Sequence, residues 1–343
     1  MRDNIMIAGI GGASLGTELA KALATASDYG IYGCDVSPSA YGLHDPTFAD
    51  AALIRRDHYI ADVLDLCRRW DIACVIPGGE EPLRLLEAAR ASFEAEGPAL
   101  AINASELIQT CRDKSLLFTA LEALGVAVPW TRSIPSPEAL EACDIPGYPC
   151  IVKPSAISGG SAYVFLANDF NQLSLYSHLI YKARGPAVIQ EYVPHDEGEF
   201  TVGVLSLPDG SVTGSIALRR GFDARLSVST SDGGTLISSG YSQGVIERAP
   251  EICAQAERIA VLLGSTGPLN IQGRLQDGVL LPFEINPRFS ASTYLRTMAG
   301  FNEVDIYLQY VLHGVHQQPR SLRPGYYLRS LTERFVPMDR VHR

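Results

Sequence analysis

The first hundred residues alternate between two patterns of hydrophobic and polar positions. Short apolar runs bounded by glycine, proline or polar residues predict buried strands at residues 4–9, 30–35, 72–76 and 99–102. Segments with apolar side chains at helical spacing lie beside these runs, at residues 15–26, 59–70 and 82–95. Regular alternation of strand and helix is typical of a parallel sheet covered by helices. We therefore expect an α/β domain with a doubly wound parallel sheet over residues 1–105.

The pattern changes after residue 105. Helical spacing recurs at residues 113–124 and 304–312, and strand-like runs lie at residues 149–153, 162–166, 187–192 and 200–205. Turn signals at Pro208-Asp209-Gly210 and at Asp277-Gly278 indicate hairpins between antiparallel strands. This mixture predicts an α+β fold over residues 106–318. The remaining residues, 319–343, contain six arginines and two acidic residues and are expected to form a tail.

Composition limits the class of protein. The 343 residues correspond to two or three domains at roughly 150 residues each. A hydrophobic fraction of 46% excludes a disordered chain, and the net charge of −10 disfavours a nucleic-acid-binding protein. No apolar run reaches the ~18 residues of a membrane helix, and the N-terminus has no secretory signal. The seven cysteines are scattered without a CxxC pair, which predicts free thiols and a cytoplasmic location.

A cluster of glycines between residues 9 and 16 follows the first predicted strand and opens a helix. Glycines at this place allow a tight turn and the close approach of a phosphate to the helix N-terminus. Asp35 ends the next strand, where a dinucleotide-binding fold places its ribose ligand. Ser14 occupies the third glycine position of a GxGxxG motif. We therefore expect a structural strand–turn–helix, with a bound dinucleotide as the less favoured alternative.

Two lysines stand in positions that suit phosphate binding, in a chain with only four lysines. Lys114 opens a helix after Asp113, and Lys153 lies in an apolar strand, where an unpaired ammonium group is costly and needs an anion. The loop that follows Lys153 contains Ser158, Gly159, Gly160 and Ser161, whose backbone N–H groups can fold over phosphates. The alternatives are a surface lysine at residue 114 and an ordinary hairpin at the glycine loop.

Two glutamates follow the next apolar run. Glu191 ends this run in Gln190-Glu191-Tyr192-Val193, a pattern that suits a hinge whose backbone groups meet an adenine edge. Glu199 begins a strand eight residues later, and its carboxylate is a candidate acceptor for two ribose hydroxyls. The alternative is a pair of solvated glutamates.

The most specific pattern lies near residues 270–288. Glu284 and Asn286 are two apart on a predicted strand, so both face one side and offer the oxygen donors that Mg²⁺ prefers. Gln272 on the preceding strand is a third donor, but a regular two-residue turn at Asp277-Gly278 would pair Gln272 with Phe283 and place it on the wrong face. The site therefore requires an odd-length loop or a bulge. Arg288, just beyond the strand, is placed to stabilise a transferring phosphoryl group.

Together these motifs resemble those of the ATP-grasp superfamily, in order and in spacing, over nearly the whole chain. The glutamine in Asn270-Ile271-Gln272 is similar to the metal ligand of the carbamoyl-phosphate-synthetase-like branch. The resemblance implies a Rossmann-like domain at residues 1–105 that includes Ile76-Pro77-Gly78-Gly79-Glu80-Glu81. It also implies an ATP-grasp domain of two lobes, a lid lobe at about 126–192 and a metal-binding lobe at about 193–318.

The resemblance also implies roles for individual residues. Phosphate contacts are implied for Lys114, Lys153, Ser158, Gly159, Gly160 and Ser161. Adenine contacts are implied for Glu191 and Val193, and a ribose contact for Glu199. Gln272, Glu284 and Asn286 would hold two Mg²⁺ ions, with Mn²⁺ as a substitute, and Arg288 would act with Lys153 on the acyl phosphate. Arg219 and Arg220 lie where related ligases place substrate or phosphate contacts, with exposed strand cations as the alternative.

One residue departs from the synthetase pattern. That pattern continues as Asn-Pro-Arg-x-Ser-Arg, but Ala291 occupies the last position here, which weakens the case for carbamate or bicarbonate chemistry. The resemblance implies an ADP-forming carboxylate–amine ligase that acts on small molecules such as amino acids, commonly as a homodimer. An ATP-grasp enzyme with a bicarbonate, thiol or hydroxyl acceptor is an alternative within the fold. A nicotinamide-dependent dehydrogenase is an alternative from another class, and a non-catalytic nucleotide sensor is a further one.

Overall fold

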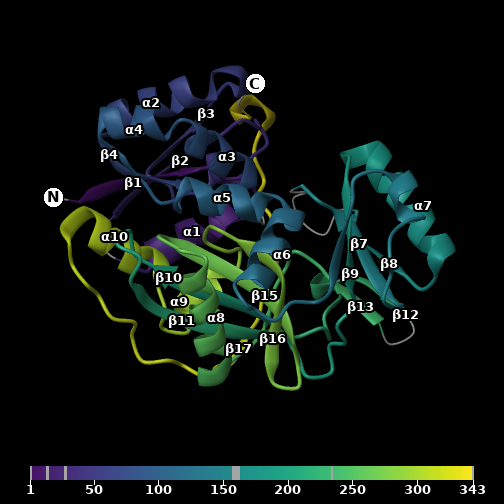
Figure 1. Cartoon of the computed structure of the whole chain (residues 1–343). Coiled ribbons are helices and arrows are strands. Elements are labelled where there is room, and N and C mark those ends of the chain that lie inside the picture. Colours follow the sequence, from purple (N-terminus) through teal and green to yellow (C-terminus); the bar gives the residue numbers. More distant parts are fainter. Residues whose placement is uncertain (1, 13–14, 27–28, 157–162, 233–234, 342–343) are drawn as a thin grey trace.

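A computed structural model describes residues 2–12, 15–26, 29–156, 163–232 and 235–341, which form sheets of five, six, four and two strands (Figure 1). The expected α/β sheet followed by an α+β region is confirmed. Within the described residues, no helix combines the length and the apolar character needed to cross a membrane.

The five-stranded sheet is parallel throughout, with the order β3-β2-β1-β4-β5. Its strands are β1 (Asp3–Ala8), β2 (Tyr29–Asp35), β3 (Asp50–Leu53), β4 (Ile72–Pro77) and β5 (Ala99–Leu100). Its helices are α1 (Leu15–Ala24), α2 (Tyr59–Trp70), α3 (Glu80–Ala88) and α4 (Arg90–Glu96). The core places Ile5 and Ile7 on the α1 face and Met6 and Ala8 on the other, as strand alternation requires. The sheet is therefore covered on both faces.

Two details of this region differ from the sequence prediction. The short strand β3 was not predicted, and the single helix expected at residues 82–95 is divided into α3 and α4. Ala89 leaves helical geometry between them, at φ −105° and ψ 13°. Neither glycine nor proline stands at this position, so the sequence carries no local signal for the break.

The glycines at residues 9–16 have the structural role that was expected. A Cβ atom on Gly16 would lie 2.0 Å from the carbonyl oxygen of Gly9, so only glycine allows this helix to approach the strand so closely. The carboxylate of Asp35 accepts hydrogen bonds from the backbone N–H of Ile10 at 2.8 Å and of Ser37 at 2.9 Å. Asp35 therefore shapes the turns of its own sheet, which argues against the dinucleotide alternative.

The four-stranded sheet is antiparallel and has the order β6-β9-β7-β8. It comprises β6 (Thr131–Ile134), β7 (Cys150–Pro154), β8 (Phe165–Ala167) and β9 (Ala187–Glu191), with α7 (Phe170–Arg184) packed against it. Residues 158–161, the predicted phosphate loop, lie outside the described residues.

The six-stranded sheet has the order β16-β15-β10-β11-β14-β17. Its strands are β10 (Glu199–Ser206), β11 (Val212–Arg220), β14 (Gly244–Ile246), β15 (Pro268–Gln276), β16 (Val279–Asn286) and β17 (Gly325–Tyr327). The two-stranded sheet consists of β12 (Val228–Asp232) and β13 (Thr235–Ser238). The tail packs on the body through β17, which pairs with β14 at the edge of the sheet.

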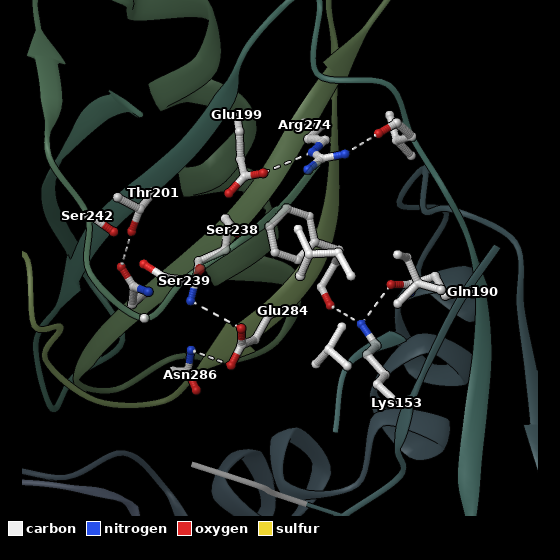
Figure 2. A pocket seen from close by; sticks show the side chains of 18 of the residues that line it. Lys153, Gln190, Glu199, Thr201, Ser238, Ser239, Ser242, Arg274, Glu284 and Asn286 are labelled. Carbon is white, nitrogen blue, oxygen red and sulfur yellow. Dashed lines mark hydrogen bonds and ion pairs between the residues drawn. The ribbon is translucent and has the colours of Figure 1, made fainter. Parts of the chain in front are cut away.

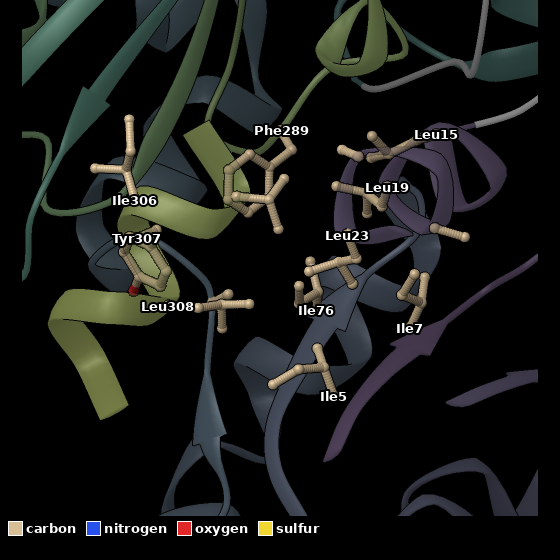
Figure 3. Packing of buried hydrophobic residues seen from close by; sticks show 14 of the residues in the cluster. Ile5, Ile7, Leu15, Leu19, Leu23, Ile76, Phe289, Ile306, Tyr307 and Leu308 are labelled. Atoms are coloured by element: carbon tan, nitrogen blue, oxygen red, sulfur yellow. The ribbon is translucent and has the colours of Figure 1, made fainter. Parts of the chain in front are cut away.

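Helices cover both faces of the six-stranded sheet. The core on one face includes side chains from α5 (Ser105–Arg112), α6 (Lys114–Ala123) and α8 (Pro250–Leu262). The core on the other face combines α9 (Thr293–Met298) and α10 (Glu303–His313) with α1 of the first sheet (Figure 3). Because Leu19 and Leu23 share this core with Phe289 and Leu308, the first sheet is packed against the six-stranded sheet. The division into domains at residues 105 and 318 stays a prediction.

Candidate functional site

A cavity of about 260 Å³ lies between the four-stranded and six-stranded sheets (Figure 2). Most of the predicted site residues line it: Lys114, Lys153, Glu191, Val193, Glu199, Gln272, Glu284, Asn286 and Arg288. The sequence analysis missed several further lining residues: Gln190, Thr201, Asn270, Arg274 and the segment 236–240 with Ser242. The fold therefore brings together predicted site residues that are up to 174 positions apart, from Lys114 to Arg288.

Lys153 reaches this cavity from β7 and is held by groups on two other strands. Its Nζ atom donates to the side-chain oxygen of Gln190 at 2.7 Å and to the carbonyl oxygen of Phe283 at 2.8 Å. The ammonium group also lies 5.5 Å from the ring centre of Phe118. Burial lowers the pKa of Lys153 to about 7, with the nearby Lys114 adding to the shift and Glu284 opposing it. Both hydrogen-bond acceptors of Lys153 are neutral, so its charge is available to an anion in the cavity.

Lys114 is positioned by the start of α6. Asp113 caps the helix by accepting a hydrogen bond from the N–H of Ser115 at 2.8 Å, and it also accepts one from the hydroxyl of Ser155 at 2.9 Å. The backbone N–H of Lys114 donates to the carbonyl oxygen of Ser155 at 2.9 Å. Burial lowers the pKa of Lys114, and Glu284 and Glu80 oppose the shift. Lys114 is half-buried and lines the cavity, which disfavours the alternative of an ordinary surface lysine.

The hairpin β15–β16 contains the bulge that the metal site requires. Its turn is a regular one, because Gln276 pairs with Val279, but the register shifts between Gln272 and Gly273. Gln272 consequently lies opposite Glu284 instead of Phe283. A Cβ atom on Gly273 would lie 2.7 Å from the carbonyl oxygen of Leu281, so glycine is needed where the strands come close. The bulge places Gln272 and Glu284 on one face.

Glu284 lies between two side-chain amides. Gln272 donates to one of its oxygens at 3.2 Å. Asn286 donates to the other at 3.3 Å (Figure 2). Rotation of each amide about its last side-chain bond would turn the carbonyl oxygen toward the same place as the carboxylate. This set of one carboxylate and two amide oxygens fits Mg²⁺, which takes few protein oxygens and shares its other positions with water and phosphates.

Glu199 is buried in an ion-pair network and is not a solvated glutamate. It is fully buried, with Arg220 at 3.1 Å from one carboxylate oxygen and Arg274 at 2.9 Å from the other. Arg274 also donates to the carbonyl oxygen of Val193 at 2.6 Å and to that of Leu236 at 2.7 Å. Arg274 was missed, although the strand pattern signals it: Asn270, Gln272 and Arg274 are spaced two apart on one face of β15.

The two neighbouring arginines of β11 point in different directions. Arg219 is exposed and does not line the cavity, whereas Arg220 is buried against Glu199. Successive residues of a strand face opposite sides, so only one member of such a pair can face the cavity. The predicted nucleotide contact at Arg219 therefore has no support from its exposed position, and Arg220 is the arginine that pairs with Glu199.

Glu191, at the predicted hinge, and Arg288 also have partners in the structure. The carboxylate of Glu191 accepts a hydrogen bond from the N–H of Trp130 at 3.1 Å, and the two backbones are joined as well. Arg288 forms an ion pair with Glu80, which begins α3 just beyond β4. This pair joins the segment after β16 to the carboxyl end of the parallel sheet, where the strand order reverses, a usual place for ligands in such sheets.

Comparisons with known proteins show what the chain is similar to. Residues 185–334 match the family described as ATP-grasp in the biosynthetic pathway with Ter operon. Over 236 residues the chain is 28% identical to the carbamoyl phosphate synthase large chain of Neisseria meningitidis, a match that covers 67% of this chain and 21% of that protein. The chain thus spans about a fifth of the length of this curated relative.

Two solved structures share the fold over almost the whole chain. The L-amino acid ligase from Bacillus licheniformis has a TM-score of 0.65 at 17% identity, with 94% of this chain and 78% of that chain covered. The biotin carboxylase domain of the Hydrogenobacter thermophilus 2-oxoglutarate carboxylase, in complex with MgADP, ADP and bicarbonate, has a TM-score of 0.66 at 16% identity. That comparison covers 95% of this chain and 73% of the other. At these identities the two structures establish the fold alone.

Proposed function

We propose that this chain is an ATP-grasp ligase, which activates a small carboxylate with ATP and joins it to an amine. The observation that carries the proposal is the convergence of Lys153 and Glu284 on one cavity. Lys153 contacts the backbone of Phe283, the residue before Glu284, so a cation and a candidate metal ligand face the same space. A phosphate chain with bound Mg²⁺ needs both.

The proposed reaction has two steps. In the first step, a carboxylate oxygen of the substrate attacks the γ-phosphorus of ATP, and the bond from that phosphorus to the β,γ-bridging oxygen breaks. The products of this step are ADP and an acyl phosphate. The amine nitrogen then attacks the acyl carbon, the bond from that carbon to the phosphate oxygen breaks, and the amine proton passes to solvent. The products are an amide, ADP and phosphate.

The protein contributes position and charge to these steps. Lys114 and Lys153 neutralise phosphate oxygens, and burial of both ammonium groups strengthens that interaction. Gln272, Glu284 and Asn286 would hold two Mg²⁺ ions, or Mn²⁺ in their place. Bound Mg²⁺ neutralises charge on the phosphoryl oxygens during transfer.

Other contacts complete the proposal. Arg288, now paired with Glu80, would stabilise the acyl phosphate. Adenine would meet the backbone at Glu191 and Val193, and the ribose would lie near Glu199. Gly159 and Gly160 would cover the phosphates. The seven cysteines are unpaired, which supports a cytoplasmic location. The biotin carboxylase relative was solved as a domain dimer, and we extend a homodimer to this chain as a proposal.

A second candidate uses another acceptor in the same site. The bound bicarbonate of the biotin carboxylase relative favours bicarbonate as that acceptor, whereas Ala291 in place of a second arginine argues against it. The amine-ligase reading is the one we favour. The nicotinamide alternative loses support because the glycines of residues 9–16 are used for packing within the first sheet.

The test is phosphate release from ATP with a panel of amino acids, supplied singly and in pairs, and with bicarbonate. We expect release that depends on a particular pair, with an amide as the second product. Lys153→Met should lower kcat/KM by about 100-fold or more, as loss of a charged transition-state contact does. Lys182→Met, at an exposed lysine of α7, is the matched control and should leave the rate unchanged. Normal turnover by Lys153→Met would exclude the proposed site.

A further inference from the structure

The C-terminal tail contributes a buried arginine to the body of the protein. The side chain of Arg329 is only 6% exposed, and it lies two residues after β17, which pairs with β14. Its Nη1 atom lies 3.3 Å from the carboxylate of Glu18 on α1, and Glu18 is itself 4% exposed. A buried cation of this kind is costly unless every donor has a partner.

All three nitrogens of the Arg329 guanidinium group have partners, and the partners come from three separate segments. Nε donates to the carbonyl oxygen of Ser242 at 3.3 Å, Nη2 donates to the carbonyl oxygen of Ala291, and Nη1 pairs with Glu18. Its backbone N–H also donates to the side-chain oxygen of Gln243 at 3.1 Å. The planar fork of arginine can satisfy three acceptors at fixed angles, which an ammonium group cannot do.

Two of these partners belong to the wall of the candidate site. Ser242 and Ala291 both line the cavity, and the adjoining Ser290 and Ser292 line it as well. In Figure 2, Ser242 lies on the side of the cavity away from Lys153 and Gln190. Arg329 therefore holds together two cavity-lining segments that are 49 residues apart, and it fixes both to α1 of the first sheet.

The tail is anchored to the first sheet a second time, beyond Arg329. The guanidinium group of Arg334 lies 5.3 Å from the ring centre of Tyr41, and Tyr41 packs closely against Gly12 at the glycine turn. Strand pairing at β17, the Arg329 fork and this stacking contact lie in order along the tail. The tail thus joins the six-stranded sheet to the glycine turn across one side of the site.

We propose that Arg329 is a positioning residue that sets the shape of the cavity wall at Ser242 and Ala291. It thereby sets the affinity for the substrate that occupies this side of the cavity, and nucleotide binding on the Lys153 side does not depend on it. The expected effect on substrate affinity rests on the proposed function. The effect on the shape of the cavity wall does not rest on it, because that effect follows from the contacts of Arg329 alone.

The first experiment measures amide hydrogen exchange in the full chain, comparing Arg329→Met with Arg323→Met. Arg323 is an exposed arginine of the same tail and serves as the matched control. We expect exchange in residues 239–243 and 289–292 to accelerate about tenfold in Arg329→Met alone, since local opening follows the loss of its contacts. MgADP affinity should stay within about twofold of the wild type in both variants. Unchanged exchange in Arg329→Met would overturn the inference. A loss of MgADP affinity in this variant as large as the about tenfold change in exchange would also overturn it.

The second experiment uses the substrate pair found in the phosphate-release panel. Arg329→Met should raise the KM of one substrate about tenfold with little change in kcat, which is the signature of lost ground-state positioning. Arg329→Lys keeps the charge but cannot satisfy both carbonyl oxygens, so its KM should remain elevated. A wild-type KM in Arg329→Lys would contradict the role assigned to the planar guanidinium group. If the panel yields no substrate, the proposed function fails, but the exchange experiment still decides the role of Arg329.

Discussion

The ammonium nitrogen of Lys153 lies 2.8 Å from the carbonyl oxygen of Phe283, although 130 residues separate the two in the sequence. This contact joins β7 of the four-stranded sheet to β16 of the six-stranded sheet and places the lysine beside Glu284. Neither of its two hydrogen-bond acceptors carries a charge. The cost of burying the ammonium group is therefore little offset, and burial lowers the pKa of Lys153. A bound anion would supply the negative charge that these neutral partners lack.

Nucleotide affinity should depend on pH through Lys153. Its pKa of about 7 means that the nucleotide-free protein loses this positive charge above pH 7. Since a phosphate favours the charged lysine, the Kd for MgADP should rise by up to about tenfold per pH unit above pH 7. Calorimetric titration from pH 6 to pH 9 measures this. Lys153→Met should show weaker binding without this rise, and a slope shared by the wild type and the variant would show that another group is responsible.

The stability of the nucleotide-free protein should show the opposite trend with pH. The pKa of Lys153 is lowered from 10.5 to about 7, so between these values the unfolded chain binds more protons than the folded chain. The free energy of unfolding, relative to that of Lys153→Met, should therefore increase as pH rises from about 7 toward 10. Below pH 7 the difference should be constant. Urea denaturation at a series of pH values measures it, and a difference that falls with pH would contradict the lowered pKa.

Glu284 should make nucleotide binding depend on Mg²⁺. Glu284→Gln keeps the size of the side chain but removes the one charged donor among the three candidate ligands. We expect the gain in ADP affinity on adding Mg²⁺ to fall by about tenfold or more, since removal of a charged ligand weakens a hard-cation site. Glu251→Gln, at an exposed position of α8, is the control. If Mg²⁺ increased the ADP affinity of Glu284→Gln as much as that of the wild type, Glu284 would not be a metal ligand.

Replacement of Glu199 should lower the free energy of unfolding. Glu199→Gln removes the charged partner that two buried arginines, Arg220 and Arg274, share. We expect a loss of about 3 kcal/mol in the free energy of unfolding, as for other buried pairs that lose one partner. Denaturant titration against Glu122→Gln, an exposed position of α6, measures this. A loss no greater than that of the control would show that the network is dispensable.

Gly273 should be required for the bulge that brings Gln272 opposite Glu284. In Gly273→Ala, the new Cβ atom meets the backbone of Leu281 at 2.7 Å, so the strands must move apart. We expect a loss of about 2 kcal/mol in the free energy of unfolding, together with a weaker Mg²⁺ effect on ADP binding. Gly325→Ala is the control, because a Cβ atom there meets nothing within 4 Å. Equal stability of the two variants would contradict the assigned role of Gly273.

The sequence by itself determined the local elements and the identity of most candidate groups. Apolar periodicity predicted the parallel sheet, and it predicted α6 and α10 nearly to their ends. Residue type and even spacing identified Glu284 and Asn286, and the cost of a buried ammonium identified Lys153. The predicted elements are present and these three side chains line one cavity, because strand and helix periods fix which neighbours along the chain share a face. Their roles in binding stay predictions.

Only the tertiary structure decided which partners these groups meet. The pairing of Glu199 with Arg220 and Arg274, of Arg288 with Glu80, and of Arg329 with Glu18 joins strands and helices that no local pattern relates. The bulge at Gly273 was a stated requirement of the sequence, but its existence depends on how two strands pack against the rest of the sheet. Long-range contacts follow from the combined packing of all elements, and a single sequence records the side chains without recording which of them meet.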